Sequence, residues 1–238
     1  MIPGDPSCTD VLILCGGRGT RLQSVAADKP KPMVEVDNRP FLDLLIDHAA
    51  TFGFRRFVLL AGHHAEAIAS HYETPRDGLA IEVSVEPQAM GTGGAVRHAQ
   101  PLIQSDPFLV LNGDSFCRVD LTALLHYHFQ LEDALAIIAL APKKEAADYG
   151  GVTVDEAGRI LRFDEKNPEA ASGLVNAGLY VFNCGVLDRI PAGRTISLET
   201  EVFPALAGQG LYGFTTDSEL YDIGTPERLD RARRELKI

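Results

Sequence analysis

A glycine-rich loop followed by two cations near the start of the chain could bind a phosphate group. The loop contains Gly16, Gly17 and Gly19 and directly follows a short apolar run. Glycine lets the backbone turn tightly and approach a ligand closely. The N–H groups of such a loop and fixed cations can point at one anion, and Arg21 and Lys31 would supply the cations here. Each cation taken alone could instead be a solvated surface residue.

Two common phosphate-binding motifs do not match this loop. The Walker A motif ends in Gly-Lys-Ser/Thr, and no Gly-Lys pair follows the glycines. The dinucleotide-binding motif requires glycine at its sixth position, where the stretch beginning at Gly17 has Leu22. No acidic residue lies at the usual distance beyond it at the end of a second predicted strand. A phosphate site here would therefore use another motif, and the alternative is a glycine-rich surface turn with scattered cations.

A second glycine-rich segment follows Glu86, in Glu-Pro-Gln-Ala-Met-Gly-Thr-Gly-Gly-Ala. Guanine carries two adjacent donors, a ring N–H and an exocyclic amine, and one carboxylate can accept from both. Uracil and thymine flank one ring N–H with carbonyl oxygens, which a carboxylate would repel. Gly91 and its neighbours would let a base or ribose pack against the backbone, and we expect Thr92 to cap the next helix. Glu86 is a candidate for binding guanine, and the alternative is an exposed residue at a strand end.

Two aspartates follow apolar segments and could hold a metal ion together. Asp114 ends the stretch Leu-Asn-Gly-Asp, and Asp222 begins Asp-Ile-Gly-Thr-Pro-Glu. Two carboxylates are the usual protein share of a Mg²⁺ site, in which water and phosphate oxygens complete the coordination. Either aspartate could instead cap a helix.

The elements expected around these residues alternate strand and helix through the first half of the chain. This order is typical of a mostly parallel sheet with helices on both faces, in which ligands bind at the carboxyl ends of the strands. The glycine loop, Glu86 and Asp114 all follow predicted strands, which indicates one shared site. The predicted strands span 11–14, 56–61, 80–85 and 108–111, and the helices span 40–52, 65–72 and a segment beginning near 92.

The pattern changes after Asp114, where a hairpin over 151–163 and a longer strand are expected. No linker, low-complexity tract or internal repeat divides the chain. We therefore expect a single domain over residues 1–238, with halves at about 10–115 and 116–238. The predicted helices of the second half span 121–131, 198–206 and 226–236, and the strands span 134–140, 151–154, 160–163, 174–182 and 211–215.

Composition favours a globular protein that acts on small molecules. The chain has 238 residues, 45% of them hydrophobic, and a formal net charge of −11. This charge disfavours binding to nucleic acid, and no apolar stretch is long enough to span a membrane. The first ten residues lack the pattern of a signal peptide, and the four cysteines have no metal-binding or disulfide spacing. We expect a cytoplasmic protein with free thiols.

The motifs resemble those of the sugar-1-phosphate nucleotidyltransferases, also called nucleotide-sugar pyrophosphorylases. The signature of that family is Leu-x-Gly-Gly-x-Gly-Thr-Arg-Leu followed by Pro-Lys-Pro-Met, and the resemblance extends over residues 11–229. It implies a three-layer α/β/α Rossmann-like nucleotidyltransferase fold with a mostly parallel mixed sheet, and no β-helical extension after Asp222. The chain resembles the guanylyltransferases in having glutamate at position 86. Members of the family that use thymidine or uridine nucleotides usually have glutamine there.

The resemblance also implies roles for individual residues. Nucleotide contacts are expected in the first half from Leu14, Gly16, Gly17, Gly19, Thr20, Glu86, Gly91 and Thr92. The expected catalytic residues are Arg21, Lys31, Asp114 and Asp222, of which the two aspartates would hold Mg²⁺. Tyr-Gly, Glu-Lys and Asn-x-Gly elements in the second half match the family's sugar-phosphate site, and they contribute Gly150, Glu165, Lys166 and Asn176.

The implied reaction is attack by a sugar 1-phosphate oxygen on the α-phosphorus of GTP, with release of pyrophosphate. Within the family the chain looks most like the D-glycero-α-D-manno-heptose 1-phosphate guanylyltransferases, with the mannose 1-phosphate guanylyltransferases close behind. Transfer of uridylyl or thymidylyl groups is a further alternative. So is a non-catalytic subunit that binds nucleotide sugars, although the chain retains the charged residues that catalysis requires. No nucleic acid or membrane partner is expected, and the sequence leaves open whether the chain forms a homo-oligomer.

Overall fold

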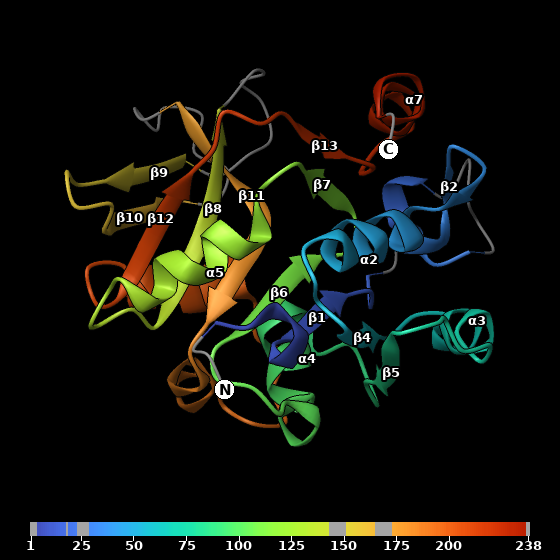
Figure 1. Ribbon diagram of the computed structural model, residues 1–238, viewed down its shortest axis with the longest axis horizontal. Helices are drawn as coiled ribbons and strands as arrows, with labels where there is room; N and C mark the ends of the chain where they lie inside the picture. Colours follow the sequence, from blue (N-terminus) through green and yellow to red (C-terminus); the bar gives the residue numbers. More distant parts are fainter. Residues whose placement is uncertain (1–3, 18, 23–28, 143–150, 165–172, 237–238) are drawn as a thin grey trace.

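The fold is built around a central mixed β-sheet (Figure 1). The computed structural model describes residues 4–17, 19–22, 29–142, 151–164 and 173–236. Within these ranges nine strands form one sheet. They are β1 (Asp10–Leu14), β4 (Arg56–Ala61), β5 (Ala80–Val85), β6 (Phe108–Asn112), β8 (Ala136–Pro142), β9 (Gly151–Val154), β10 (Ile160–Asp164), β11 (Leu174–Phe182) and β12 (Leu211–Thr215).

The sheet is parallel through the first half of the chain. β1 lies between β4 and β6, and β5 pairs with the outer side of β4, all in parallel. β11 then runs antiparallel to β6 and β8, and β12 pairs in parallel with β8. In this register Leu14 pairs with both Leu60 and Asn112. The carboxyl ends of the central strands therefore lie side by side.

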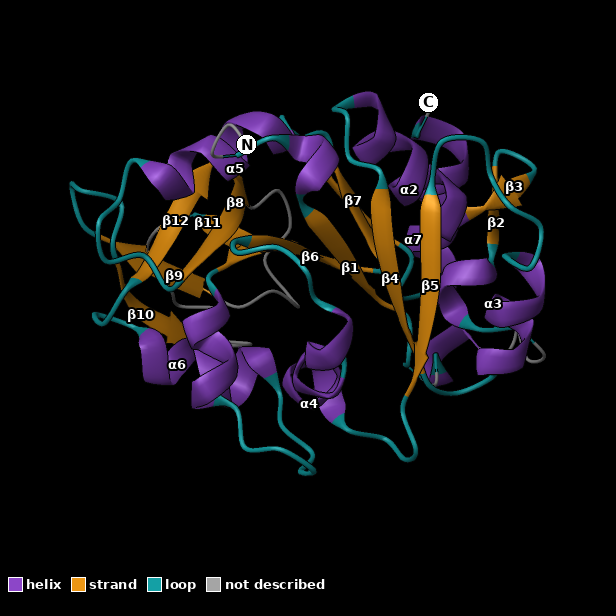
Figure 2. Cartoon of the chain, turned by 60° about the horizontal axis from the view of Figure 1, so that its bottom comes forward, coloured by secondary structure: helices purple, strands orange, loops and turns teal. Residues whose placement is uncertain are grey.

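Helices cover both faces of the sheet, as the strand-helix alternation predicted. Along β1, Val11 and Ile13 are buried in one apolar cluster and Leu12 in another, because successive side chains of a strand point to opposite faces. The first cluster includes residues of α2 (Phe41–Thr51), α3 (Ala65–His71), α5 (Leu121–Phe129) and α7 (Pro226–Glu235). The second includes residues of α4 (Gly91–His98) and α6 (Phe203–Leu206). Figure 2 shows α2 and α5 on one side of the sheet and α4 and α6 on the other. The predicted three-layer arrangement with a mixed sheet is confirmed.

Two short ribbons stand apart from the main sheet. β2 (Glu35–Val36) pairs with β3 (Arg39–Pro40), and β7 (Ser115–Cys117) pairs antiparallel with β13 (Leu220–Asp222). The sequence did not predict the second ribbon, which joins the middle of the chain to its last part. Short 3₁₀ helices complete the described elements at Pro6–Cys8, Thr20–Leu22, Lys31–Met33, Gln100–Leu102 and Cys184–Arg189.

The segment 198–206 differs from the continuous helix that was predicted. Leu198–Val202 forms a turn of π-helix, and only Phe203–Leu206 is α-helical. Pro204 has no N–H to donate to the preceding turn, and a widened turn before it removes the need for that hydrogen bond. The break turns Glu199 toward the site described below.

Two further expectations bear on the class of protein. The cysteines at positions 8, 15, 117 and 184 are all free thiols, as predicted. Among the helices of the described ranges, none is both long and apolar enough to cross a membrane.

Candidate active site

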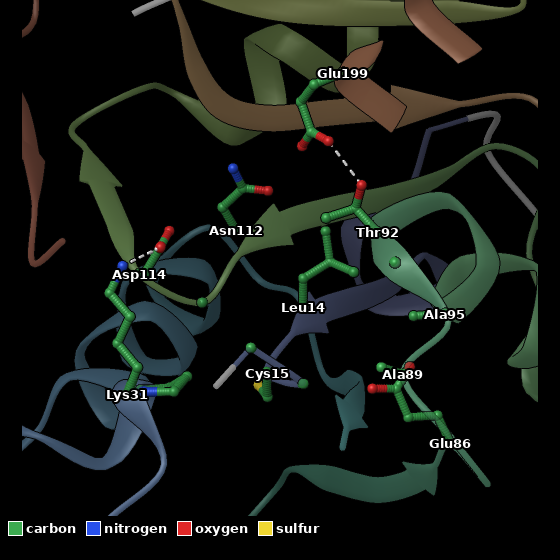
Figure 3. A pocket seen from close by; sticks show the side chains of 15 residues that line it. Leu14, Cys15, Lys31, Glu86, Ala89, Thr92, Ala95, Asn112, Asp114 and Glu199 are labelled. Carbon is green, nitrogen blue, oxygen red and sulfur yellow. Dashed lines mark hydrogen bonds and ion pairs between the residues drawn. The ribbon is translucent and has the colours of Figure 1, made fainter. Parts of the chain in front are cut away.

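A cavity of about 400 Å³ opens at the carboxyl ends of β1 and β6, beside the N-terminal end of α4 (Figure 3). This is the position at which sheets of this kind bind ligands. Its walls combine glycine backbone, one lysine and three carboxylates. The residues that line it are Leu14, Cys15, Gly16, Gly17, Lys31, Pro32, Glu86, Ala89, Gly91, Thr92, Ala95, Asn112, Gly113, Asp114 and Glu199.

Lys31 and Asp114 meet at one end of this cavity as an ion pair between Nζ and Oδ2. Pro30 and Pro32 fix the start of the 3₁₀ helix that carries Lys31. Gly113 lies directly against this region, since a Cβ there would stand 3.1 Å from Cγ of Pro32 and would contact the Leu14 carbonyl. The lysine side chain is 13% exposed and the aspartate side chain 38%. The anion is therefore the more accessible partner.

The β7–β13 ribbon brings Asp222 beside the segment that carries Asp114, although Asp222 is not among the residues that line the cavity. Asp222 pairs in register with Ser115, and the N–H of Ile223 donates to the Asp114 carbonyl at 3.0 Å. A Cβ on Gly224 would lie 2.8 Å from Asp222 Oδ1 and 3.6 Å from Lys31 Nζ. The two aspartates and the lysine, predicted from separate motifs, thus come together. Arg228 forms an ion pair with Asp222 at 3.4 Å.

This donor set fits a magnesium ion. Asp114 and Asp222 supply carboxylate oxygens from two adjacent backbone segments. The described ranges contain no larger cluster, of three or more His, Cys, Asp or Glu, that could hold a metal through protein groups alone. Such a pair leaves the other coordination positions to phosphate and water, which is how Mg²⁺ usually binds. Lys31 occupies an oxygen of Asp114, so the lysine and a metal would compete for that oxygen.

Glu86 lies at the other end of the cavity, just after β5. Its Oε2 accepts a hydrogen bond from the Met90 N–H at 3.0 Å. Its Oε1 lies over Gly16 and Gly62, where a Cβ on Gly16 would stand 2.8 Å away. Burial raises the pKa of Glu86, and the Met90 N–H opposes this effect. The carboxylate also borders a second cavity of about 230 Å³ on the side of His63 and Gln88.

Thr92 does not cap α4, contrary to the expectation. The helix begins at Gly91, after Met90, without a side-chain cap. The Thr92 hydroxyl donates to Glu199 Oε2 at 2.7 Å and accepts from the Leu198 N–H at 2.8 Å. The Thr92 hydroxyl, which was expected to cap the helix, is instead hydrogen-bonded to Glu199 and Leu198 of a distant segment.

The glycines of α4 pack against protein as well as lining the cavity. The N–H groups of Gly93 and Gly94 both donate to the Ile196 carbonyl, at 2.9 and 3.1 Å. Gly91 has a positive φ of 70°, and a Cβ there would stand 2.5 Å from the same carbonyl oxygen. The glycines thus hold the segment around Ile196 against the helix, a role that the sequence did not indicate.

Several of the described residues predicted for the site are not found in the wall of this cavity. Arg21 is exposed on the 3₁₀ helix Thr20–Leu22, and Gly19 and Arg21 are not among the described residues that line the cavity. The side chain of Thr20 lies outside the described part of the structure. Asn176 on β11 donates to the Tyr180 hydroxyl at 2.9 Å and accepts from the Gly178 N–H at 2.9 Å. Gly150, Glu165 and Lys166 lie outside the described residues. The lining residues that sequence reasoning did not single out are Cys15, Pro32, Ala89, Ala95, Asn112, Gly113 and Glu199.

Comparison with known proteins identifies the family. Residues 10–237 match the nucleotidyl transferase family. A mannose-1-phosphate guanylyltransferase of Mycobacterium tuberculosis is 35% identical over 231 residues, which cover 95% of this chain and 64% of that protein. A D-glycero-alpha-D-manno-heptose 1-phosphate guanylyltransferase of Aneurinibacillus thermoaerophilus is 31% identical over 229 residues, which cover 96% of this chain and 98% of that protein.

A solved structure is similar to this chain over nearly its whole length. HddC from Yersinia pseudotuberculosis, crystallised as a complex with GMP-PN, superposes with a TM-score of 0.83 at 29% identity, over 96% of this chain and all of that one. The chain belongs to the nucleotidyl transferase family. The predicted family and the predicted enzyme class are therefore confirmed. The chain spans less than two thirds of the Mycobacterium relative but nearly all of the heptose enzyme.

Proposed function

We propose that the protein joins GTP and D-glycero-α-D-manno-heptose 1-phosphate to give GDP-heptose and pyrophosphate. One observation carries the choice of a nucleotide: a single cavity has Glu86 at one end and the Lys31–Asp114 pair at the other, with the glycine loop between them. The full-length match to a heptose 1-phosphate guanylyltransferase supports the sugar. Mannose 1-phosphate is the second candidate, because the Mycobacterium relative bears that name at higher identity.

At the base end, Glu86 would accept hydrogen bonds from the two adjacent donors of guanine. The Met90 N–H holds Oε2 from the protein side, so the carboxylate keeps a fixed orientation while its remaining lone pairs face the cavities. A fixed acceptor loses little conformational freedom when the base binds.

At the phosphate end of the cavity, protein groups would offset the negative charge of the phosphates. The N–H groups of Gly16 and Gly17 and the ammonium of Lys31 would face the phosphates, whereas the Cys15 N–H donates to the Leu60 carbonyl at 2.8 Å. Arg21 would reach the departing pyrophosphate from the exposed helix Thr20–Leu22. Asp114 and Asp222 are the residues that would hold Mg²⁺, which when bound supplies further charge neutralisation at the reacting phosphates. The attacking phosphate oxygen is already anionic, so no general base is required, and catalysis consists of positioning and electrostatics.

The sugar phosphate would bind on the side of the second half of the chain. Lys166 would contact its phosphate, and Glu165, Asn176 and the backbone at Gly150 would contact its hydroxyl groups. These roles rest on the motif resemblance.

Pyrophosphate release measured with Mg²⁺, GTP and a panel of sugar 1-phosphates tests the proposal. Release should require both substrates and be fastest with the heptose 1-phosphate. Faster release with mannose 1-phosphate would reassign the sugar, and faster release with UTP or dTTP would reassign the base. Binding of GDP-sugars without turnover of any pair would indicate the non-catalytic alternative.

A further inference from the structure

Glu199 faces the cavity with one carboxylate oxygen already held by the protein. Oε2 accepts from the Thr92 hydroxyl at 2.7 Å and from the Ser197 hydroxyl at 2.9 Å. The π-helical turn Leu198–Val202 carries this side chain, and such turns are frequent at functional sites. Because both hydrogen bonds converge on Oε2, the carboxylate is fixed and Oε1 can accept from a ligand.

Asn112 supplies a second acceptor to the same cavity. Its Oδ1 is buried and has no hydrogen-bond partner within the described part of the chain. The side chain is held in place, because it hydrogen-bonds the Tyr180 hydroxyl and lies against Gly178, where a Cβ would stand 3.0 Å from it. A buried acceptor without a donor is unfavourable, so a ligand that brings a donor to it gains affinity.

The position of this pair separates it from the nucleotide end. In Figure 3, Asn112 and Glu199 lie on the opposite side of Leu14 from Glu86. Both pack against the second half of the chain, Asn112 through Tyr180 of β11 and Glu199 through its own turn. A carboxylate and an amide oxygen repel phosphate and favour neutral donors, and hydroxyl groups are the neutral donors of a sugar 1-phosphate.

We propose that Glu199 and Asn112 bind ring hydroxyl groups of the sugar and so contribute to sugar specificity. This inference rests on the proposed function, since it assumes that a sugar 1-phosphate enters the cavity beside the nucleotide. Thr92 and Ser197 are then positioning residues, because they hold Glu199 and need not touch the sugar.

The test combines protein variants with substrates that lack one hydroxyl. Glu199→Gln keeps the size of the side chain and removes its charge, and Asn112→Ala removes the amide. The substrates are whichever of heptose or mannose 1-phosphate turns over faster, and its 2-, 3- and 4-deoxy derivatives. Glu201→Gln is the matched control, because Glu201 belongs to the same turn but is exposed, accepts from the Ser197 N–H and does not line the cavity.

Glu199→Gln should raise the KM for the sugar phosphate by about ten- to a hundred-fold, the range expected for a lost hydrogen bond to a charged group, and leave the KM for GTP nearly unchanged. One deoxy derivative should lose a similar factor with the wild-type protein but little with the variant, because the two changes remove the same contact. Asn112→Ala should show the same loss of discrimination at one hydroxyl.

Three results would overturn the inference. Equal penalties for every deoxy derivative in wild type and variants would mean that neither residue touches the sugar. A rise in the KM for GTP alone would mean that Glu199 and Asn112 contact the nucleotide. An equal effect of Glu201→Gln would mean that Glu199 only stabilises the π-helical turn. A wild-type protein that releases no pyrophosphate with any sugar 1-phosphate would instead reject the proposed function, and this inference with it.

Discussion

Lys31 and Asp114 form an ion pair across the phosphate end of the cavity, although 83 residues separate them in the sequence. The pair holds a cation and an anion together at the place where a metal and phosphates are expected. In the proposed function, Lys31 would turn to phosphate oxygens and Asp114 would be left to hold the metal. The ion pair therefore joins the two side chains to which the phosphates and the metal are assigned.

Asp114→Asn and Asp222→Asn should each lower kcat by about 10²–10³, which is typical of losing one group that stabilises transition-state charge. Each change keeps the side-chain size and removes a carboxylate charge. The measurement is kcat at saturating Mg²⁺, with the melting temperature as a check on folding. Asp188→Asn, at an exposed position, is the control. Near-normal kcat in both site variants would reject the two-carboxylate metal site.

Lys31→Ala should reduce kcat and raise the KM for GTP, because the lysine lines the end of the cavity assigned to phosphates. Lys166→Ala should mainly raise the KM for the sugar phosphate. Steady-state kinetics with each substrate varied in turn distinguish the two effects. If both variants altered both constants equally, the division into nucleotide and sugar sides would be wrong.

Gly62→Ala should displace the Glu86 carboxylate and so change the choice of base. A Cβ at Gly62 would collide with Glu86 Oε1 and would stand 3.0 Å from the Gly16 carbonyl oxygen, so the carboxylate would have to leave its position on the Met90 N–H. The ratio of kcat/KM for GTP to that for UTP should therefore fall. Gly17→Ala is the comparison, because Gly17 lines the cavity but a Cβ there would meet no described protein atom within 4 Å. It should weaken GTP and UTP alike. A GTP preference retained in Gly62→Ala would contradict the role of Glu86.

The stability of the protein should fall in mild acid. Burial lowers the pKa of His128 and of His48, and Asp106 opposes the effect at His128. The unfolded chain, in which the pKa of histidine is about 6.5, then binds more protons than the folded protein. Stability is therefore complete above that pH and is lost as the pH falls through the lowered values, by at most about 1.4 kcal/mol per pH unit for each histidine.

Urea unfolding between pH 5 and pH 8 measures this effect. His128→Leu should reduce the pH dependence, while His126→Gln, at an exposed position on the same helix, should leave it unchanged. Identical pH profiles for wild type and His128→Leu would show that another group causes the acid sensitivity.

Local sequence patterns were sufficient for the strands that build the site. The predicted bounds 80–85 and 174–182 match β5 and β11, because continuous β-favouring runs end at glycine, proline or a change of polarity. Gly16 and Gly17 of the glycine loop, Glu86 and Asp114 all line one cavity, as expected for residues that follow parallel strands.

Contacts between distant segments could not be predicted in the same way. β7 and β13 have three residues each, too few for a periodic pattern, and their pairing places Asp222 beside Asp114. Glu199 lies in a stretch that resembles an ordinary exposed helix. Its position in the cavity wall depends on the π-helical turn and on the contact with Thr92, 107 residues away. That same contact made the predicted helix cap wrong.

The ratio of kcat/KM for GTP to that for UTP, in wild type and in Glu86→Gln, tests the central claim most directly. The wild-type protein should prefer GTP. The variant should lose between about five-fold and a hundred-fold of that preference, because an amide must turn one N–H toward a guanine donor or leave that donor unpaired. The variant should also accept UTP better, since glutamine can donate to a carbonyl and accept from the ring N–H. An unchanged ratio, or a wild-type protein that prefers UTP, would contradict the assignment of guanine to this site.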